Sequence, residues 1–89
     1  MNLEFFDQGD ILFEEGGAGD KFYIIYDGRV GISIKDQGQV SELKKGDSFG
    51  ELSLLFGQPR SATAVVLENS EIITLSKDSY ELIIKVSLT

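Results

Sequence analysis

The sequence predicts a mainly β fold, a small antiparallel barrel or roll. Three observations lead to this fold class: short strand-like runs, Gly- or Asp-containing turns at intervals of roughly 8–12 residues, and only two helical segments. The 89 residues suffice for one domain.

Six runs are expected to be strands, because each is rich in β-branched or aromatic residues or alternates apolar with polar positions. They are residues 11–13, 22–26, 30–34, 40–43, 62–67 and 71–75. In residues 30–34 the apolar side chains alternate with Gly31 and Ser33, which predicts one buried face. The dipeptide Asp27-Gly28 predicts a tight hairpin turn of the primed type, since Gly tolerates a positive φ.

Two segments are expected to be helical. Residues 51–56 are predicted to form a short helix directly after Gly50. A second helix is expected after Ser76, which suits the N-cap and is followed by Asp78 in the first turn. No Gly or Pro stop signal follows this helix before the last residue.

Composition excludes several classes of function. The formal net charge of −7 argues against non-specific nucleic-acid binding and against adhesion to anionic membranes. Cys and His are absent, which removes thiolate and imidazole metal ligands and the commonest general base. No window approaches the roughly 18 apolar residues of a membrane span, and no targeting signal is recognisable. We therefore expect a cytoplasmic, non-enzymatic domain without a metal and without direct contact to nucleic acid or insertion into a membrane.

The most informative motif reads Phe-Gly-Glu-Leu-Ser-Leu-Leu at residues 49–55 and Pro-Arg-Ser-Ala-Thr at residues 59–63. A ligand can approach the backbone at Gly50, and the unpartnered N–H groups of a following helix favour a phosphate. Arg60 offers a planar fork that matches two phosphate oxygens. Glu51 would repel a phosphate, but its carboxylate suits a hydroxyl donor such as a ribose 2′-OH. The motif thus indicates a ligand with a phosphate and a sugar hydroxyl side by side.

At these residues the chain resembles the cyclic-nucleotide-binding domain family. The phosphate-binding cassette of that family reads F-G-E-[LM]-[AS]-L-L and then P-R-[STA]-A-[TS], and the chain matches both parts without a mismatch. An upstream family pattern is also present, as Gly19, the apolar residues 22–25 and Gly28. The resemblance implies an eight-stranded antiparallel β-roll of the double-stranded β-helix or jelly-roll type. In it Arg60 binds the cyclic phosphate and Glu51 the ribose 2′-OH. The ligand-binding residues that it implies are Gly50, Glu51, Leu52, Arg60, Ser61 and Ala62.

The resemblance spans nearly the whole chain. It implies that residues 1–89 form one cyclic-nucleotide-binding domain that ends before the C-terminal helix that closes over the base in relatives. The expected ligand is cAMP or cGMP, and a further expected partner is an effector domain or subunit of a longer parent protein. Serine at the position of Ser61 can contact a guanine amino group, but it also occurs in cyclic-AMP binders, and we favour cAMP over cGMP.

Plainer interpretations stand beside these. Glu51 and Arg60 can form a structural ion pair. Residues 16–19 are rich in Gly but lack the Gly-Lys-Ser/Thr ending of a P-loop, so a turn is favoured. Residues 22–26 are expected to form barrel wall and not a base-stacking platform. The alternative function is a non-binding structural or protein-interaction domain that retains the β-roll.

Overall fold

The computed structural model describes residues 2–50, 57–80 and 82, and these contain eight strands. Their bounds are β1 (Asn2–Phe6), β2 (Ile11–Phe13), β3 (Lys21–Asp27), β4 (Arg29–Ile34), β5 (Gly38–Lys44), β6 (Ser48–Phe49), β7 (Thr63–Val66) and β8 (Ser70–Ser76). All pairings between them are antiparallel. The predicted fold class is confirmed.

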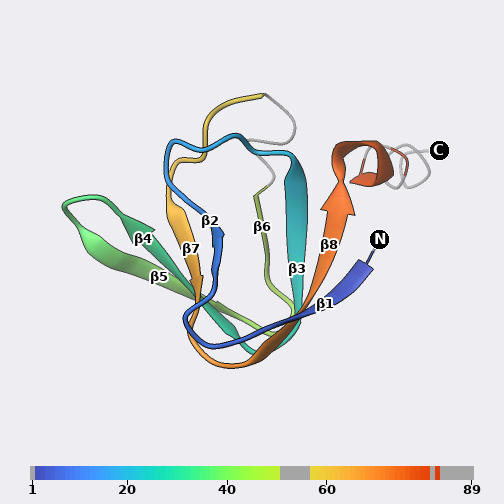
Figure 1. The fold of residues 1–89 in the computed structure, drawn as a ribbon, viewed down its shortest axis with the longest axis horizontal. Coiled ribbons are helices and arrows are strands. Elements are labelled where there is room, and N and C mark those ends of the chain that lie inside the picture. The colour runs from blue at the N-terminus through green and yellow to red at the C-terminus, as the bar shows by residue number, and fades with distance from the viewer. Residues whose placement is uncertain (1, 51–56, 81, 83–89) are drawn as a thin grey trace.

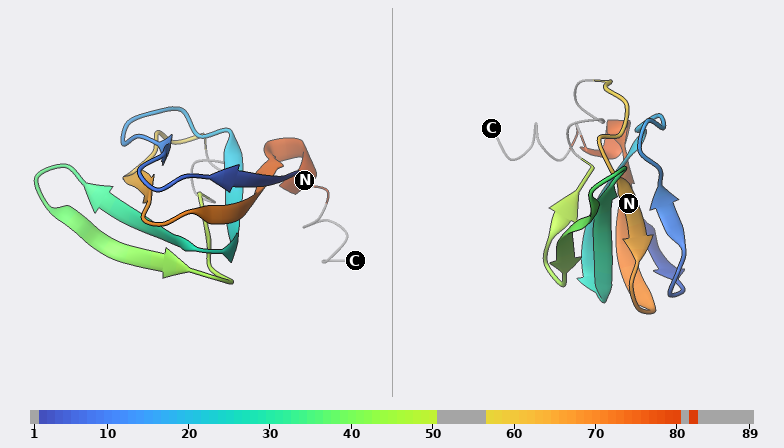
Figure 2. Two further views of the ribbon diagram at one scale, coloured as in Figure 1. Left: turned by 60° about the horizontal axis from the view of Figure 1, so that its bottom comes forward. Right: turned by 90° about the vertical axis from the view of Figure 1, so that its left-hand side faces the viewer.

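The strands form two four-stranded sheets (Figure 1). The first sheet has the order β1-β8-β3-β6 and the second has the order β2-β7-β4-β5. The chain changes sheet at every connection except the β4–β5 hairpin, which projects from one side of the roll (Figures 1 and 2). As a result β1 pairs with β8, β2 with β7, β3 with β6 and β4 with β5, which is a long hairpin coiled into a jelly roll.

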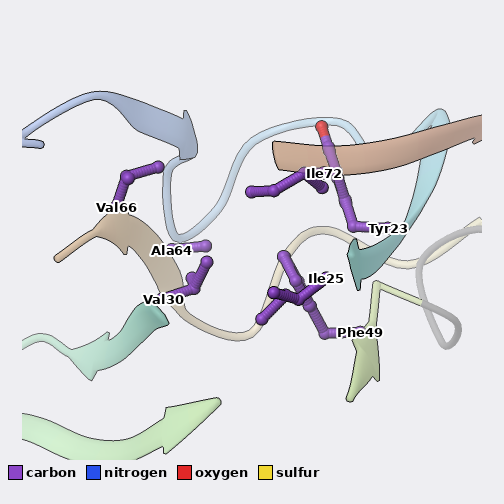
Figure 3. Packing of buried hydrophobic residues seen from close by; sticks show 7 residues of the cluster. All are labelled: Tyr23, Ile25, Val30, Phe49, Ala64, Val66 and Ile72. Atoms are coloured by element: carbon purple, nitrogen blue, oxygen red, sulfur yellow. The ribbon is translucent and has the colours of Figure 1, made fainter. Parts of the chain in front are cut away.

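The main core lies between the two sheets (Figure 3). Both sheets contribute to it through alternate residues that point inward. Its seven buried members are Tyr23, Ile25, Val30, Phe49, Ala64, Val66 and Ile72. The prediction that residues 22–26 form barrel wall is confirmed, because Tyr23 and Ile25 face this core while Phe22 belongs to a second cluster.

The structure corrects the predicted hairpin at Asp27-Gly28. The strands β3 and β4 on either side of it lie in different sheets, so this turn is a crossing between sheets. Gly28 has φ +123°, and a Cβ there would lie 2.0 Å from Oγ of Ser70. The same hydroxyl accepts a hydrogen bond from the amide of Arg29 at 3.2 Å. Gly is therefore required because two sheet crossings touch at this corner.

Two strands, β1 and β6, were not predicted. In β1, Leu3 and Phe5 are 47% and 76% exposed, and Phe6 is the one apolar residue of the strand that packs against the core. A single inward apolar residue leaves no alternation in the sequence that would reveal the strand. The strand β6 has only two residues. The predicted edge strand at residues 40–43 is confirmed, because β5 lies at the edge of the second sheet. It is longer than predicted and spans Gly38–Lys44.

A helix begins after β8 as predicted, and residues 77–80 are helical. The amide of Ser79 donates to Oγ of Ser76 at 3.3 Å, which confirms the N-cap. Tyr80 packs on Phe22 and Leu75 in the second apolar cluster. The predicted helix 51–56 and residues 83–89 lie outside the described residues. No helix in the described part of the chain is long and apolar enough to cross a bilayer.

We expect Gly28→Ala to destabilise the fold more than Gly9→Ala does. Both positions have positive φ, at +123° and +94°, so both substitutions carry a backbone cost of about 1–2 kcal/mol. Only at Gly28 does the new methyl group overlap with neighbouring atoms, which adds about 1–3 kcal/mol. Urea denaturation of the two variants measures the difference, and equal losses would contradict the tight corner.

Candidate anion-binding site

Arg60 lies just before β7 and is the most deeply buried charged residue among those described, at 4% exposure. One terminal nitrogen of its guanidinium donates to the carbonyl of Gly50 at 3.1 Å. The other donates to the carbonyl of Lys21 at 2.8 Å. These carbonyls come from the end of β6 and the start of β3, so a side chain attached next to the second sheet is held by the first.

Gly50 leaves room for this guanidinium. It has φ +93°, and a Cβ there would lie 2.7 Å from the terminal nitrogen NH1 of Arg60 and 3.1 Å from the carbonyl oxygen of Lys21. Any side chain at this position would displace the arginine. The described contacts show that Gly50 makes space for Arg60, while the approach of a ligand at this glycine stays a prediction.

The main chain of Arg60 is fixed by the loop between β2 and β3. Its carbonyl accepts from the amide of Gly16 and its amide donates to the carbonyl of Gly17, both at 2.8 Å. Next to this pair, the amide of Glu15 donates to Oγ1 of Thr63 at 2.9 Å. The Gly-rich loop at residues 16–19, predicted to be a turn and not a P-loop, therefore fixes the backbone position from which the Arg60 side chain starts.

The guanidinium of Arg60 lies over an aromatic ring. Cζ of Arg60 is 4.1 Å from the ring centroid of Phe13 and 5.9 Å from that of Tyr23. These rings belong to a cluster with Phe49, whose ring is stacked on Tyr23 at 5.0 Å and tilted to Phe13 at 5.9 Å. Such cation–π contacts stabilise a buried cation by about 0.5–2 kcal/mol.

The third nitrogen of the guanidinium, Nε, has no hydrogen-bond acceptor among the described residues. Nε of Arg60 is buried, and it makes no hydrogen bond to any described residue. Among the described residues both salt bridges belong to Arg29, so no described carboxylate forms a salt bridge with Arg60. Burial lowers the pKa of the guanidinium, and the nearby Tyr23 and Asp20 oppose this shift. A buried cation with an unused N–H donor is suited to an anionic ligand.

The other predicted site residues fall around Arg60 as follows. Ser61 is exposed, and Ala62 is buried at 8% exposure directly before β7. Glu51 and Leu52 lie outside the described residues, and the alternative of a Glu51–Arg60 ion pair stays a prediction. Within the described ranges, no group of three or more Asp, Glu, His or Cys residues is placed to hold a metal ion.

Sequence analysis missed three contributors to this site. They are the ring of Phe13, the carbonyl of Lys21 and the backbone of the loop at residues 16–17. A backbone carbonyl leaves no mark in the sequence. The ring of Phe13 was visible only as part of a three-residue strand, too short for its inward face to be assigned.

Comparison with known proteins places the chain in one family. The cyclic nucleotide-binding domain family matches residues 3–86. A cAMP-dependent protein kinase regulatory subunit of Eremothecium gossypii is 36% identical over 81 residues, which is 91% of this chain and 18% of that protein. The chain thus spans less than a fifth of the length of this curated relative.

Solved structures show the same fold. The regulatory domain of Toxoplasma gondii PKA, crystallised with cAMP, gives a TM-score of 0.86 at 26% identity, covering 92% of this chain and 33% of that chain. The EAL enzyme Bd1971 matches in cAMP-bound and cGMP-bound forms with TM-scores of 0.81 and 0.83 and identities of 32% and 30%. Each form covers 98% of this chain and 27% of that chain. This chain belongs to the cyclic nucleotide-binding domain family.

We expect stability to fall at high pH because of Tyr23. Burial raises the pKa of its phenol in the folded state, and the cation of Arg60 opposes the shift. A raised folded pKa contributes stability that is complete below the unfolded pKa of about 10 and is lost as the pH rises past it, by up to about 1.4 kcal/mol per pH unit. The urea midpoints of unfolding at pH 8 and pH 11 should differ less for Tyr23→Phe than for the unsubstituted protein.

Tyr26→Phe provides the matched control, because Tyr26 is 55% exposed. Its pH dependence should follow that of the unsubstituted protein, because this variant retains the buried phenol of Tyr23. If Tyr23→Phe and Tyr26→Phe lost the same stability between the two pH values, the burial of the Tyr23 phenol would not be the cause.

Proposed function

We propose that this chain is a regulatory module that binds a cyclic nucleotide at Arg60, with cAMP favoured over cGMP, and that it performs no chemistry on the ligand. The observation that carries the proposal is the buried guanidinium of Arg60. Its terminal nitrogens donate to two carbonyls, its Cζ lies over the ring of Phe13, and its Nε donor is unused. Membership of the family and the intact cassette sequence support the same ligand class.

Charge favours a cyclic phosphodiester over an open phosphate. A cyclic nucleotide carries a single negative charge on its phosphate, and Arg60 supplies a single buried positive charge. The chain as a whole has a net charge of −7, which penalises a second negative charge on the ligand. A monoanion therefore matches the site, whereas a terminal phosphate with two charges is left partly uncompensated.

The remaining predicted residues complete the proposed site. Glu51 accepts from the ribose 2′-OH, while Gly50, Leu52, Ser61 and Ala62 contribute backbone or hydroxyl contacts. The preference for cAMP is supported by the cAMP bound in the Toxoplasma gondii structure. Bd1971 has been solved with both nucleotides, so a residual affinity for cGMP is part of the proposal.

The proposed output is regulatory. The chain resembles a kinase regulatory subunit that is several times longer, so an effector domain or subunit of a parent protein is the proposed second partner. Residues 1–89 then act as its cyclic-nucleotide-binding domain in the cytoplasm. Ligand binding changes the output only as far as it distinguishes two conformations of the parent.

We expect Arg60→Ala to lose most of the affinity for cAMP, about 2–5 kcal/mol, because a buried charge partner of the phosphate is removed. Isothermal titration calorimetry measures the loss. Arg29→Ala is the control, since Arg29 is half exposed and pairs with Glu42 and Glu68 on the surface. Equal affinities of the two variants would rule out the proposed site.

We also expect the melting temperature to rise most with cAMP, less with cGMP and least with 5′-AMP. A ligand at 100 times its dissociation constant adds about 2.7 kcal/mol to the free energy of unfolding. The measurement is a thermal shift with each nucleotide at millimolar concentration. No shift with any of them would favour the alternative, a structural or protein-interaction domain that retains the roll.

A further inference from the structure

Phe13 contacts Arg60 but has no place among the proposed ligand contacts, so its role at the site is still open. Phe13 is the last residue of β2 and lies opposite Ala64 of β7. Its ring is only partly buried and packs against the main core. The guanidinium carbon of Arg60 lies 4.1 Å from its centroid, closer than to any other described ring.

The hydrogen bonds of the guanidinium and its contact with the ring constrain different motions. The two terminal nitrogens donate to carbonyl oxygens, and the Nε–H donor has no described acceptor. Two hydrogen bonds at the terminal nitrogens leave the guanidinium able to rotate about the line that joins the two carbonyl oxygens. A ring centred 4.1 Å from Cζ opposes this rotation, and so fixes the direction of the Nε–H bond.

The ring also stabilises the cation without neutralising it. A carboxylate at this position would cancel the charge that an anionic ligand needs, and no described carboxylate pairs with Arg60. The quadrupole of an aromatic face attracts a cation but carries no net charge. The full positive charge of Arg60 therefore stays available to a ligand.

We propose that Phe13 is a positioning residue for the ligand phosphate, which acts through Arg60 by holding the guanidinium plane. The proposal rests on the proposed function, since it concerns the same site. A purely structural role for Phe13 is the competing interpretation, because the ring also contacts Tyr23 at 5.7 Å and Phe49 at 5.9 Å.

Fluorination of the ring separates the two roles. Replacing Phe13 by mono-, di- and trifluorophenylalanine weakens the negative face of the ring stepwise and changes its shape little. Calorimetry with cAMP should show affinity falling stepwise, by about 2- to 30-fold over the series. The same series at Phe22, which packs on Tyr80 and Leu75 in the other cluster, should leave the affinity unchanged.

A second readout does not depend on the ligand. In the free protein, hydrogen exchange of the Arg60 Nε proton should speed up along the Phe13 series, because the guanidinium plane loosens. Constant affinity and constant exchange along that series would overturn the positioning role. If the unsubstituted protein bound no nucleotide, the proposed function would fail, while the exchange measurements on the Phe13 series would still decide whether Phe13 holds Arg60.

Discussion

The structure depends on one buried cation that is bound on three sides by groups without net charge. Taking a guanidinium out of water costs several kcal/mol, and in Arg60 this cost is offset by two carbonyls and by the face of Phe13. None of these partners neutralises the charge. The fold therefore stores a positive charge in a nearly dry environment, where its attraction for an anion is stronger than at the surface.

The jelly roll explains how neutral partners from distant parts of the chain meet at one side chain. Arg60 precedes β7 of the second sheet, yet its acceptors belong to β3 and to the end of β6 in the first sheet. The ring beneath it comes from β2, and its main chain is paired with the β2–β3 loop. A change at this site therefore acts on residues of both sheets at once.

Sequence reasoning reached the fold class and the central arginine because both leave local signals. Alternation located most strands, and Ser76 was a correct N-cap, since each depends on a few neighbouring residues. The hairpin at Asp27-Gly28 was wrong because a positive-φ glycine fits both a hairpin and a sheet crossing. The strand β1 was missed because Leu3 and Phe5 are exposed and Phe6 is its one apolar residue that packs against the core, so no alternation marks it.

The same limit applies within the site. The cassette sequence predicted roles for Arg60 and Gly50, but the contact between them could not be read from spacing alone. Gly50 is needed next to a side chain ten residues further along the chain, and Lys21 contributes only a backbone oxygen. Contacts of this kind follow from tertiary structure, which brings together β2, β3 and β6.

The most direct test of the central claim is a titration of the protein with cAMP, followed through the ¹H–¹⁵N resonance of the Arg60 Nε–H group. This donor has no acceptor among the described residues. Capture of a phosphate oxygen should move its proton resonance downfield and slow its exchange with water in step with saturation. An Nε–H resonance that stays unchanged while the protein saturates with cAMP would show that the nucleotide binds without Arg60.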